Sequence, residues 1–173
     1  MSYMNIFSSF LVSIGLLLSP VSVFAENQSS SKFRVLSTEH SGLNTKSINT
    51  FLDQAKVSIS NGNLDDAVEK LNKARNFSSL LINYYRDLNT SFRGIDALIP
   101  REMSKKTRNV IQLLAEANMQ LAIIHRSKED PELAVPLLVE VVKILTPAQP
   151  IGAKAYQQLY ELGFVDTPFG GSS

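Results

Sequence analysis

Histidine and carboxylate side chains are the groups in this sequence that would bind a metal ion or act in catalysis. Of its 173 residues, two are histidines and none is cysteine. His40 and His125 lie far apart, and neither belongs to an H-x3-H or H-E-x-x-H pattern. Without cysteine the chain has no disulfide, thiolate metal site or cysteine nucleophile. The sequence therefore predicts no metal ion and no cofactor.

The densest acidic group, Asp65, Asp66 and Glu69, lies at the predicted start of a helix, where the helix dipole favours carboxylates. Asp66 and Glu69 also stand four residues before Lys70 and Lys73, the spacing of helical ion pairs. This group therefore requires no catalytic role. The sequence also lacks a G-x-S-x-G nucleophile motif, a phosphate-binding glycine loop and a dinucleotide fingerprint. We expect no enzymatic activity.

Basic side chains gather in the segment 100–109, PREMSKKTRN, which holds one acid, Glu102. The cluster consists of Arg101, Lys105, Lys106 and Arg108, and Arg93 precedes it closely enough to join the same surface. Cations at a helix N-terminus oppose the helix dipole. Either this helix starts late, near Thr107, or the charge serves a contact with an acidic partner protein or anionic lipid headgroups. A net charge of +1 gives no support for nucleic-acid binding.

Residues 1–25 carry no charged side chain and have the order of a secretory signal peptide. An apolar core over 6–18 is followed by Pro20 and by Val-Phe-Ala at 23–25. We expect cleavage before Glu26 and export to the periplasm or thylakoid lumen. The alternative is an uncleaved membrane anchor, because the uncharged stretch has roughly the length of a bilayer span.

Residues 45–164 form the predicted folded domain. Their apolar residues recur at helical spacing almost throughout, and no segment alternates with the period of a strand. We predict an all-α fold of about six helices. The signals for helix ends are Asn61-Gly62, Pro100 and Gly163, and those for helix starts are Asn63, Asp130-Pro131 and Pro150. The third predicted helix spans 78–99 and stops at Pro100. The Ser/Asn/Gln-rich tether 26–44 and the tail 165–173 are predicted to be flexible.

Residues 51–77 resemble a tetratricopeptide repeat, a helix–turn–helix unit of about 34 residues. The resemblance rests on large and small residues of the two helices, Phe51, Ala55, Ala67, Leu71 and Ala74, and on Gly62 at the turn between them. Residues 118–147 give a second match at Leu121, Ala122, Ala134, Leu138 and Pro147. The resemblance implies a helical-repeat fold, and the alternative is an irregular antiparallel bundle. The phrases LAVPLLVEVVKILTP and YELGFVD also resemble exported proteins of photosynthetic bacteria.

The repeat resemblance implies a contact groove along the first helix of each repeat. Its positions are Leu52, Lys56 and Ile59 in the first match and Met119, Ile123 and Arg126 in the second. We therefore expect an exported, non-enzymatic protein–protein interaction module, such as an accessory or assembly factor, whose partner carries an acidic segment. The alternatives are a carrier of a small apolar ligand, with a cavity between the third, fourth and fifth predicted helices, and a membrane-anchored helical scaffold.

Overall fold

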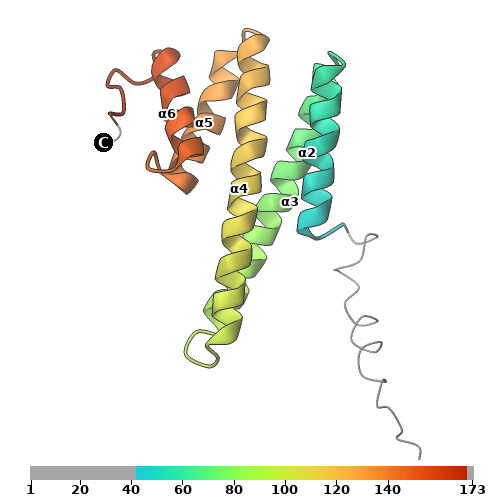
Figure 1. Cartoon of the computed structure of the whole chain (residues 1–173), viewed down its shortest axis with the longest axis vertical. Coiled ribbons are helices and arrows are strands. Elements are labelled where there is room, and N and C mark those ends of the chain that lie inside the picture. Colours follow the sequence, from blue (N-terminus) through green and yellow to red (C-terminus); the bar gives the residue numbers. More distant parts are fainter. Residues whose placement is uncertain (1–41, 171–173) are drawn as a thin grey trace, which may run out of the picture. The chain divides into compact units, whose positions relative to one another are not determined.

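Five α-helices make up the described part of the chain, residues 42–170 of this computed structural model (Figure 1). Their bounds are α2 Thr45–Ser60, α3 Leu64–Ser91, α4 Leu98–Ser127, α5 Pro131–Leu145 and α6 Pro150–Glu161. Within these residues there is no strand, so the predicted all-α class is confirmed, with five helices instead of about six. The predicted signal peptide, most of the tether and the last three residues lie outside the described residues.

The α2–α3 turn lies where the sequence predicts it. At the other end of α2, the Asn44 side chain accepts a 2.9 Å hydrogen bond from the Ser47 N–H. Gly62 follows α2 with a φ of 75°, a left-handed conformation that glycine adopts readily. Asn63 then caps α3 by accepting a 3.3 Å hydrogen bond from the Asp66 N–H. The predicted helix end and N-cap are therefore confirmed.

The predicted helix boundary at residue 78 is wrong, because α3 runs without interruption from Leu64 to Ser91. The sequence has no glycine or proline between Gly62 and Gly94 that would break it. The predicted helix over 78–99 is also wrong in its last turns, since residues 92–97 connect α3 to α4. Gly94, with a φ of 83°, turns the chain in this connection.

Helix α4 begins at Leu98, which excludes one of the two alternatives offered by the sequence, a late start near Thr107. The Asp96 carboxylate accepts hydrogen bonds from the N–H groups of Leu98 and Ile99, at 2.7 and 2.8 Å. It therefore supplies the acid that stabilises this helix start. Pro100 lies in the first turn of α4, where a backbone N–H would have no partner within the helix, so the missing N–H of proline does no harm. Pro100 therefore does not mark the end of the preceding helix.

Helices α5 and α6 begin at the predicted prolines, Pro131 and Pro150, and Gly163 follows the end of α6 as predicted. Helix α6 lies very close to the loop before it. A Cβ atom at Gly152 would stand 1.9 Å from the carbonyl oxygen of Thr146, which no side chain tolerates. Glycine is therefore required at this contact.

The helices pack mainly on their neighbours in sequence, and ion pairs join alternate helices. These are Lys56–Glu116 between α2 and α4 at 3.0 Å, Arg126–Glu161 between α4 and α6 at 3.2 Å, and Arg75–Glu140 between α3 and α5 at 3.1 Å. Helices α2, α4 and α6 therefore form one layer, and α3 and α5 form the other. The core between them includes Ile48, Leu71, Leu121, Leu138 and Val141, all almost completely buried.

Candidate functional site

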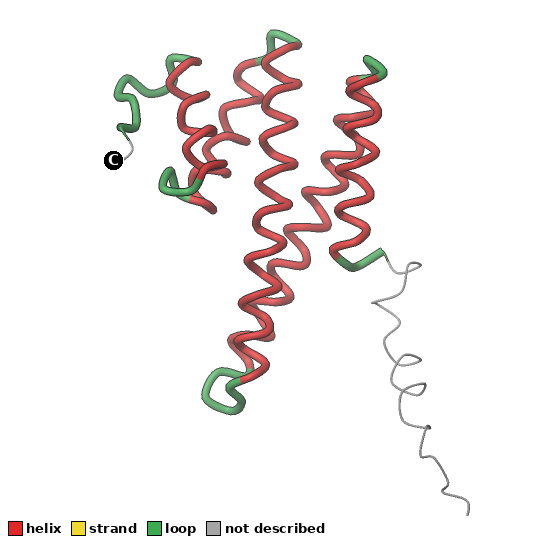
Figure 2. The backbone as a smooth tube through the Cα atoms, in the orientation of Figure 1, coloured by secondary structure: helices red, strands yellow, loops and turns green. Residues whose placement is uncertain are grey.

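The α3–α4 hairpin continues beyond the ends of the other described helices (Figures 1 and 2). Figure 2 shows the connection between α3 and α4 at the end of two helices that no third helix accompanies. On α4, the Gln112 side chain donates a 3.2 Å hydrogen bond to Gln149, which lies just after α5. The α4 residues before Gln112 therefore lie beyond α5. We call residues 80–111 the α3–α4 extension.

One face of the α3–α4 extension exposes apolar side chains that a longer α2 would cover. Phe77 stacks on Phe51 of α2, with 5.7 Å between the ring centroids. The next apolar residues on this face, Leu80, Tyr84 and Leu88, follow Phe77 at spacings of three, four and four. Their exposed fractions are 38%, 45% and 44%. We call these three residues the apolar stripe.

The connection at the end of the α3–α4 extension presents two more apolar side chains to solvent. Ile95 is 79% exposed and Leu98 is 73% exposed. The backbone of this turn is well hydrogen-bonded, because the N–H groups of Ile95 and Asp96 both donate to the Phe92 carbonyl at 3.1 Å. The exposure of the two side chains therefore belongs to a formed turn. We call Ile95 and Leu98 the apolar tip.

The opposite face of the α3–α4 extension is basic. Asn89 donates a 2.9 Å hydrogen bond to the Ser104 hydroxyl and a 2.7 Å bond to the Pro100 carbonyl, so these residues mark a line where α3 and α4 meet. The charged residues lie within one helical turn of these contacts. They are Arg86 and Arg93, before and after Asn89, and Arg101, Lys105 and Arg108, around Ser104 on α4. We call these five residues the basic face. Arg86 stands two positions from Tyr84 and from Leu88, and this spacing places it on the other side of α3 from the apolar stripe.

No side chain of the basic face forms an ion pair with another described residue. Lys106 differs, because its ammonium lies 2.8 Å from Glu102 and 5.6 Å from the centroid of the Tyr85 ring. The predicted cluster is therefore divided: Lys106 is paired, while the other predicted cations lie together. The cluster predicted from the sequence does not include Arg86. Its signal in the sequence is the spacing of seven residues from Arg93, which is about two helical turns and predicts both arginines on the same side of a helix.

The groove positions implied by the repeat resemblance do not all reach the surface. Leu52 is 1% exposed and belongs to the core, so a surface partner does not contact it. Its place on the inner side of α2, against α3, explains the difference. Ile59 and Ile123 are exposed, at 37% and 53%, and Met119 is half-buried.

The two cations of the predicted groove are already paired with acids of this chain. The Lys56 ammonium lies 3.0 Å from Glu116, whose hydrogen bond raises the pKa of Lys56. The Arg126 guanidinium lies 3.2 Å from Glu161 and also bonds to Gln158 at 3.1 Å. An acidic partner segment therefore finds more unpaired positive charge on the basic face than in this groove.

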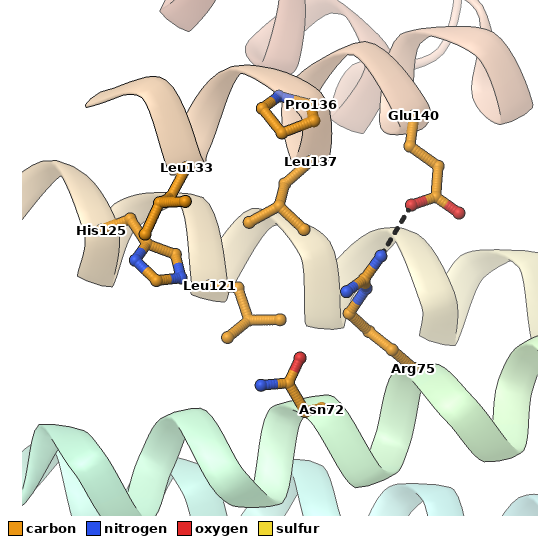
Figure 3. Close-up of a pocket in the computed structure, with 8 residues that line it drawn as sticks. All are labelled: Asn72, Arg75, Leu121, His125, Leu133, Pro136, Leu137 and Glu140. Atoms are coloured by element: carbon orange, nitrogen blue, oxygen red, sulfur yellow. Dashed lines mark hydrogen bonds and ion pairs between the residues drawn. The ribbon is translucent and has the colours of Figure 1, made fainter. Parts of the chain in front are cut away.

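A cavity of about 280 Å³ lies between α3, α4 and α5 (Figure 3). Four apolar side chains and four polar ones line it: Leu121, Leu133, Pro136 and Leu137, with Asn72, Arg75, His125 and Glu140. The Arg75–Glu140 ion pair is part of this lining. Two buried nitrogens, Arg75 Nε and His125 Nδ1, have no hydrogen-bond partner among residues 42–170. The predicted cavity was apolar and beside residues 78–99. The cavity found differs in both respects, because it is half polar and lies beside the earlier part of α3.

The acidic group at the start of α3 is held by local partners. Asp66 lies 3.3 Å from Lys70 and Glu69 lies 2.6 Å from Lys73, so both predicted helical pairs are confirmed. The Ser58 hydroxyl also donates to Asp66, and this bond is the main reason that the pKa of Asp66 is lowered. Asp65 pairs with Lys128 at 2.7 Å, which lowers the pKa of Asp65.

Within residues 42–170, no group of His, Asp and Glu side chains is arranged to hold a metal ion. No helix in this part of the chain is long and apolar enough to cross a membrane. Comparisons of the chain with protein-family models, with curated proteins and with solved structures found no match.

Proposed function

We propose that this protein is an exported, non-enzymatic protein–protein interaction module that serves as an accessory or assembly factor. The observation that carries the proposal is the apolar stripe, which lies on a formed helix without a covering element among the described residues. Contiguous exposed apolar side chains often mark interaction surfaces, whereas isolated ones are ordinary. The two-layer order of the helices supports the resemblance to helical-repeat interaction proteins.

The partner is proposed to present an amphipathic helix to the apolar stripe. The same face of α3 accepts α2 nearer the start of α3, where Phe77 stacks on Phe51, so its surface already suits a helix. A partner helix would lie where α2 would continue, with its apolar side against Leu80, Tyr84 and Leu88. An acidic segment of the same partner would be attracted to the basic face, on the other side of the α3–α4 extension.

Export to the periplasm or thylakoid lumen remains part of the proposal and rests on the signal-like order of residues 1–25. If that segment is retained as an anchor, the same module becomes a membrane-anchored scaffold. N-terminal sequencing of the protein from its host distinguishes the two, because the exported form is expected to begin at Glu26.

Site-specific photocrosslinking in the host tests the proposed contact. A photoreactive phenylalanine analogue is placed at position 84 or 88, and at the exposed position 154 of α6 as a control. We expect the two stripe positions to give a crosslinked product of one size that the control does not give. Crosslinking at position 154 alone, or the same products from all three positions, would contradict the proposal.

A carrier of a small molecule is the second candidate, favoured by the cavity between α3, α4 and α5. Its unpartnered Arg75 Nε and His125 Nδ1 atoms suit a ligand with hydrogen-bonding groups better than a purely apolar one. Native mass spectrometry of the protein from its host tests this candidate. A carrier shows an added mass that is lost on unfolding and absent from Leu133→Trp, whose larger side chain fills the rim. Wild-type protein without added mass would rule against it.

A further inference from the structure

We propose that the apolar tip and the basic face together dock the protein onto a membrane surface rich in anionic phospholipids. The inference does not depend on the apolar stripe or on the helix proposed to cover it. It assigns to lipid the basic face that an acidic segment of the protein partner would otherwise occupy. In this arrangement the side chains of Ile95 and Leu98 enter the boundary between headgroups and acyl chains, and the cations of the basic face nearest the tip lie at the level of the headgroups.

The basic face has the chemistry that recognises phosphate. Four of its five cations are arginines, whose planar guanidinium groups bind phosphate oxygens through two parallel hydrogen bonds. None of the five is neutralised by a carboxylate of the described residues. A protein of net charge +1 thus gathers, at one end of one hairpin, five cations that no carboxylate in residues 42–170 pairs with.

The apolar tip lies ahead of these cations along the hairpin axis. Arg101, Lys105 and Arg108 follow Leu98 by three, seven and ten residues. With a rise of 1.5 Å per helical residue, they stand about 5, 10 and 15 Å behind it. The headgroup layer on each side of a bilayer is roughly 5–8 Å thick. When Leu98 reaches the edge of the hydrocarbon, Arg101 is therefore level with the phosphates and Lys105 is close to the surface.

The turn conformation keeps the tip ready for this contact. The N–H groups of Ile95, Asp96, Leu98 and Ile99 are all hydrogen-bonded within the turn, so few backbone groups remain to be desolvated. Exposed apolar side chains beside a basic cluster supply the two signals that peripheral membrane binding requires.

The dimensions of the tip favour a membrane over an acidic protein as its partner. Two side chains at the end of a hairpin bury far less area than the 1,200–2,000 Å² or so of a stable protein interface. A lipid surface instead accommodates the tip while it surrounds the basic face with many phosphates. The binding is expected to weaken as salt is raised, because these cations are exposed and readily screened.

Vesicle binding by the full chain tests the proposal, with phosphatidylcholine vesicles that contain or lack phosphatidylglycerol. The basic-face variant Arg101→Gln/Lys105→Gln is compared with Lys143→Gln/Lys154→Gln, which removes the same charge from exposed positions outside the extension. Circular dichroism confirms that both remain folded. We expect the basic-face variant to bind the anionic vesicles roughly thirtyfold more weakly than wild type, and the control pair to bind nearly as wild type. Equal losses in both variants would overturn the proposal.

Insertion of the tip is measured separately, because the apolar segment 1–25 of the full chain is expected to bind lipid in every variant. The chain has no tryptophan, so Leu98→Trp introduces a single fluorescent reporter at the tip. We expect its emission to shift to shorter wavelength with anionic vesicles and to be quenched by brominated lipids. Unchanged emission would overturn the proposal. So would a basic-face variant that keeps its lipid binding but loses a crosslinked protein partner, since the face would then serve an acidic protein.

Discussion

At the residue scale, the positive charges of this protein fall into two groups that differ in their pairing. Lys56 and Arg126 are held by Glu116 and Glu161 and tie helices together. The five cations of the basic face have no such carboxylate among the described residues. Exposed cations gain nothing from lying next to one another, and the proposed contact with anionic lipid would offset the repulsion within the second group.

The acidic residues at the start of α3 predict how stability depends on pH. Hydrogen bonds from Lys128, the Ser58 hydroxyl and Lys73 are the main causes that lower the pKa values of Asp65, Asp66 and Glu69, in that order. A carboxyl group whose pKa is lower in the folded chain than in the unfolded chain stabilises the fold only while it is ionised. The contribution of these three groups is therefore fully present above about pH 5 and is lost as the pH falls through the lowered values.

Chemical denaturation at pH 6 and at pH 3 measures this contribution. We expect the wild type to lose stability at pH 3, and the triple variant Asp65→Asn/Asp66→Asn/Glu69→Gln to lose less. An equal loss in both proteins would show that these carboxylates are not responsible.

The composition of the candidate surface was only partly predictable from single residues. Arg101, Lys105 and Arg108 lie close together in the sequence, so their clustering needed no structure. The addition of Arg86 depends on how α3 and α4 are aligned, which the Asn89–Ser104 hydrogen bond reports. The pairing of Lys56 with Glu116 was not predictable, because Glu116 lies on another helix. The sequence spacing indicates only the longer contact with Asp53, three residues before Lys56.

At the element scale, helix ends were predictable wherever a local chemical signal fixes them. Asn63, Gly62 and the prolines at the starts of α5 and α6 are such signals. The expected boundary at residue 78 has no signal of this kind. The buried face of α3 changes there because α3 leaves the cover of α2, and a change of packing partner resembles the start of a new helix in the sequence.

The close packing of α2 against α3 predicts the effect of enlarging a small residue between them. Ala55 on α2 and Ala67 on α3 are completely buried. We expect Ala67→Leu to lower the free energy of unfolding by about 1–3 kcal/mol, because the added atoms have no space. Thermal or chemical denaturation measures this effect. The control is Asn76→Leu, at an exposed position of α3, and a similar loss there would contradict the close contact.

The contact between α6 and the preceding loop gives a second prediction at this scale. A Cβ atom at position 152 would clash with the backbone of Thr146, at 1.9 Å from its oxygen and 2.7 Å from its carbonyl carbon. We expect Gly152→Ala to destabilise the fold by about 1–3 kcal/mol in chemical denaturation. Gly170→Ala, where nothing lies within 4 Å, should be neutral. A neutral Gly152→Ala would show that α6 is not held in this position.

At the scale of the described domain, the helices form two parts. One is a packed body, made of the described residues outside 80–111, and the other is the α3–α4 extension, which no third helix accompanies. The body holds nearly all the fully buried side chains, and its cations Lys56 and Arg126 are paired. The α3–α4 extension exposes the apolar stripe, the apolar tip and the basic face. We therefore propose that the extension recognises partners and that the body supports it structurally.

The most direct test of this division is the apparent mass of the tagged protein in a gentle extract of its host, measured by size-exclusion chromatography. The comparison is between the wild type, Tyr84→Ser/Leu88→Ser and the control Lys143→Ser/Lys154→Ser. Since Tyr84 and Leu88 are both more than two-fifths exposed, their replacement should leave the melting temperature nearly unchanged. The account predicts that the wild type and the control elute in a larger assembly and that the stripe variant elutes as the free chain. A stripe variant that stays in the assembly, or a wild type that elutes alone, would contradict it.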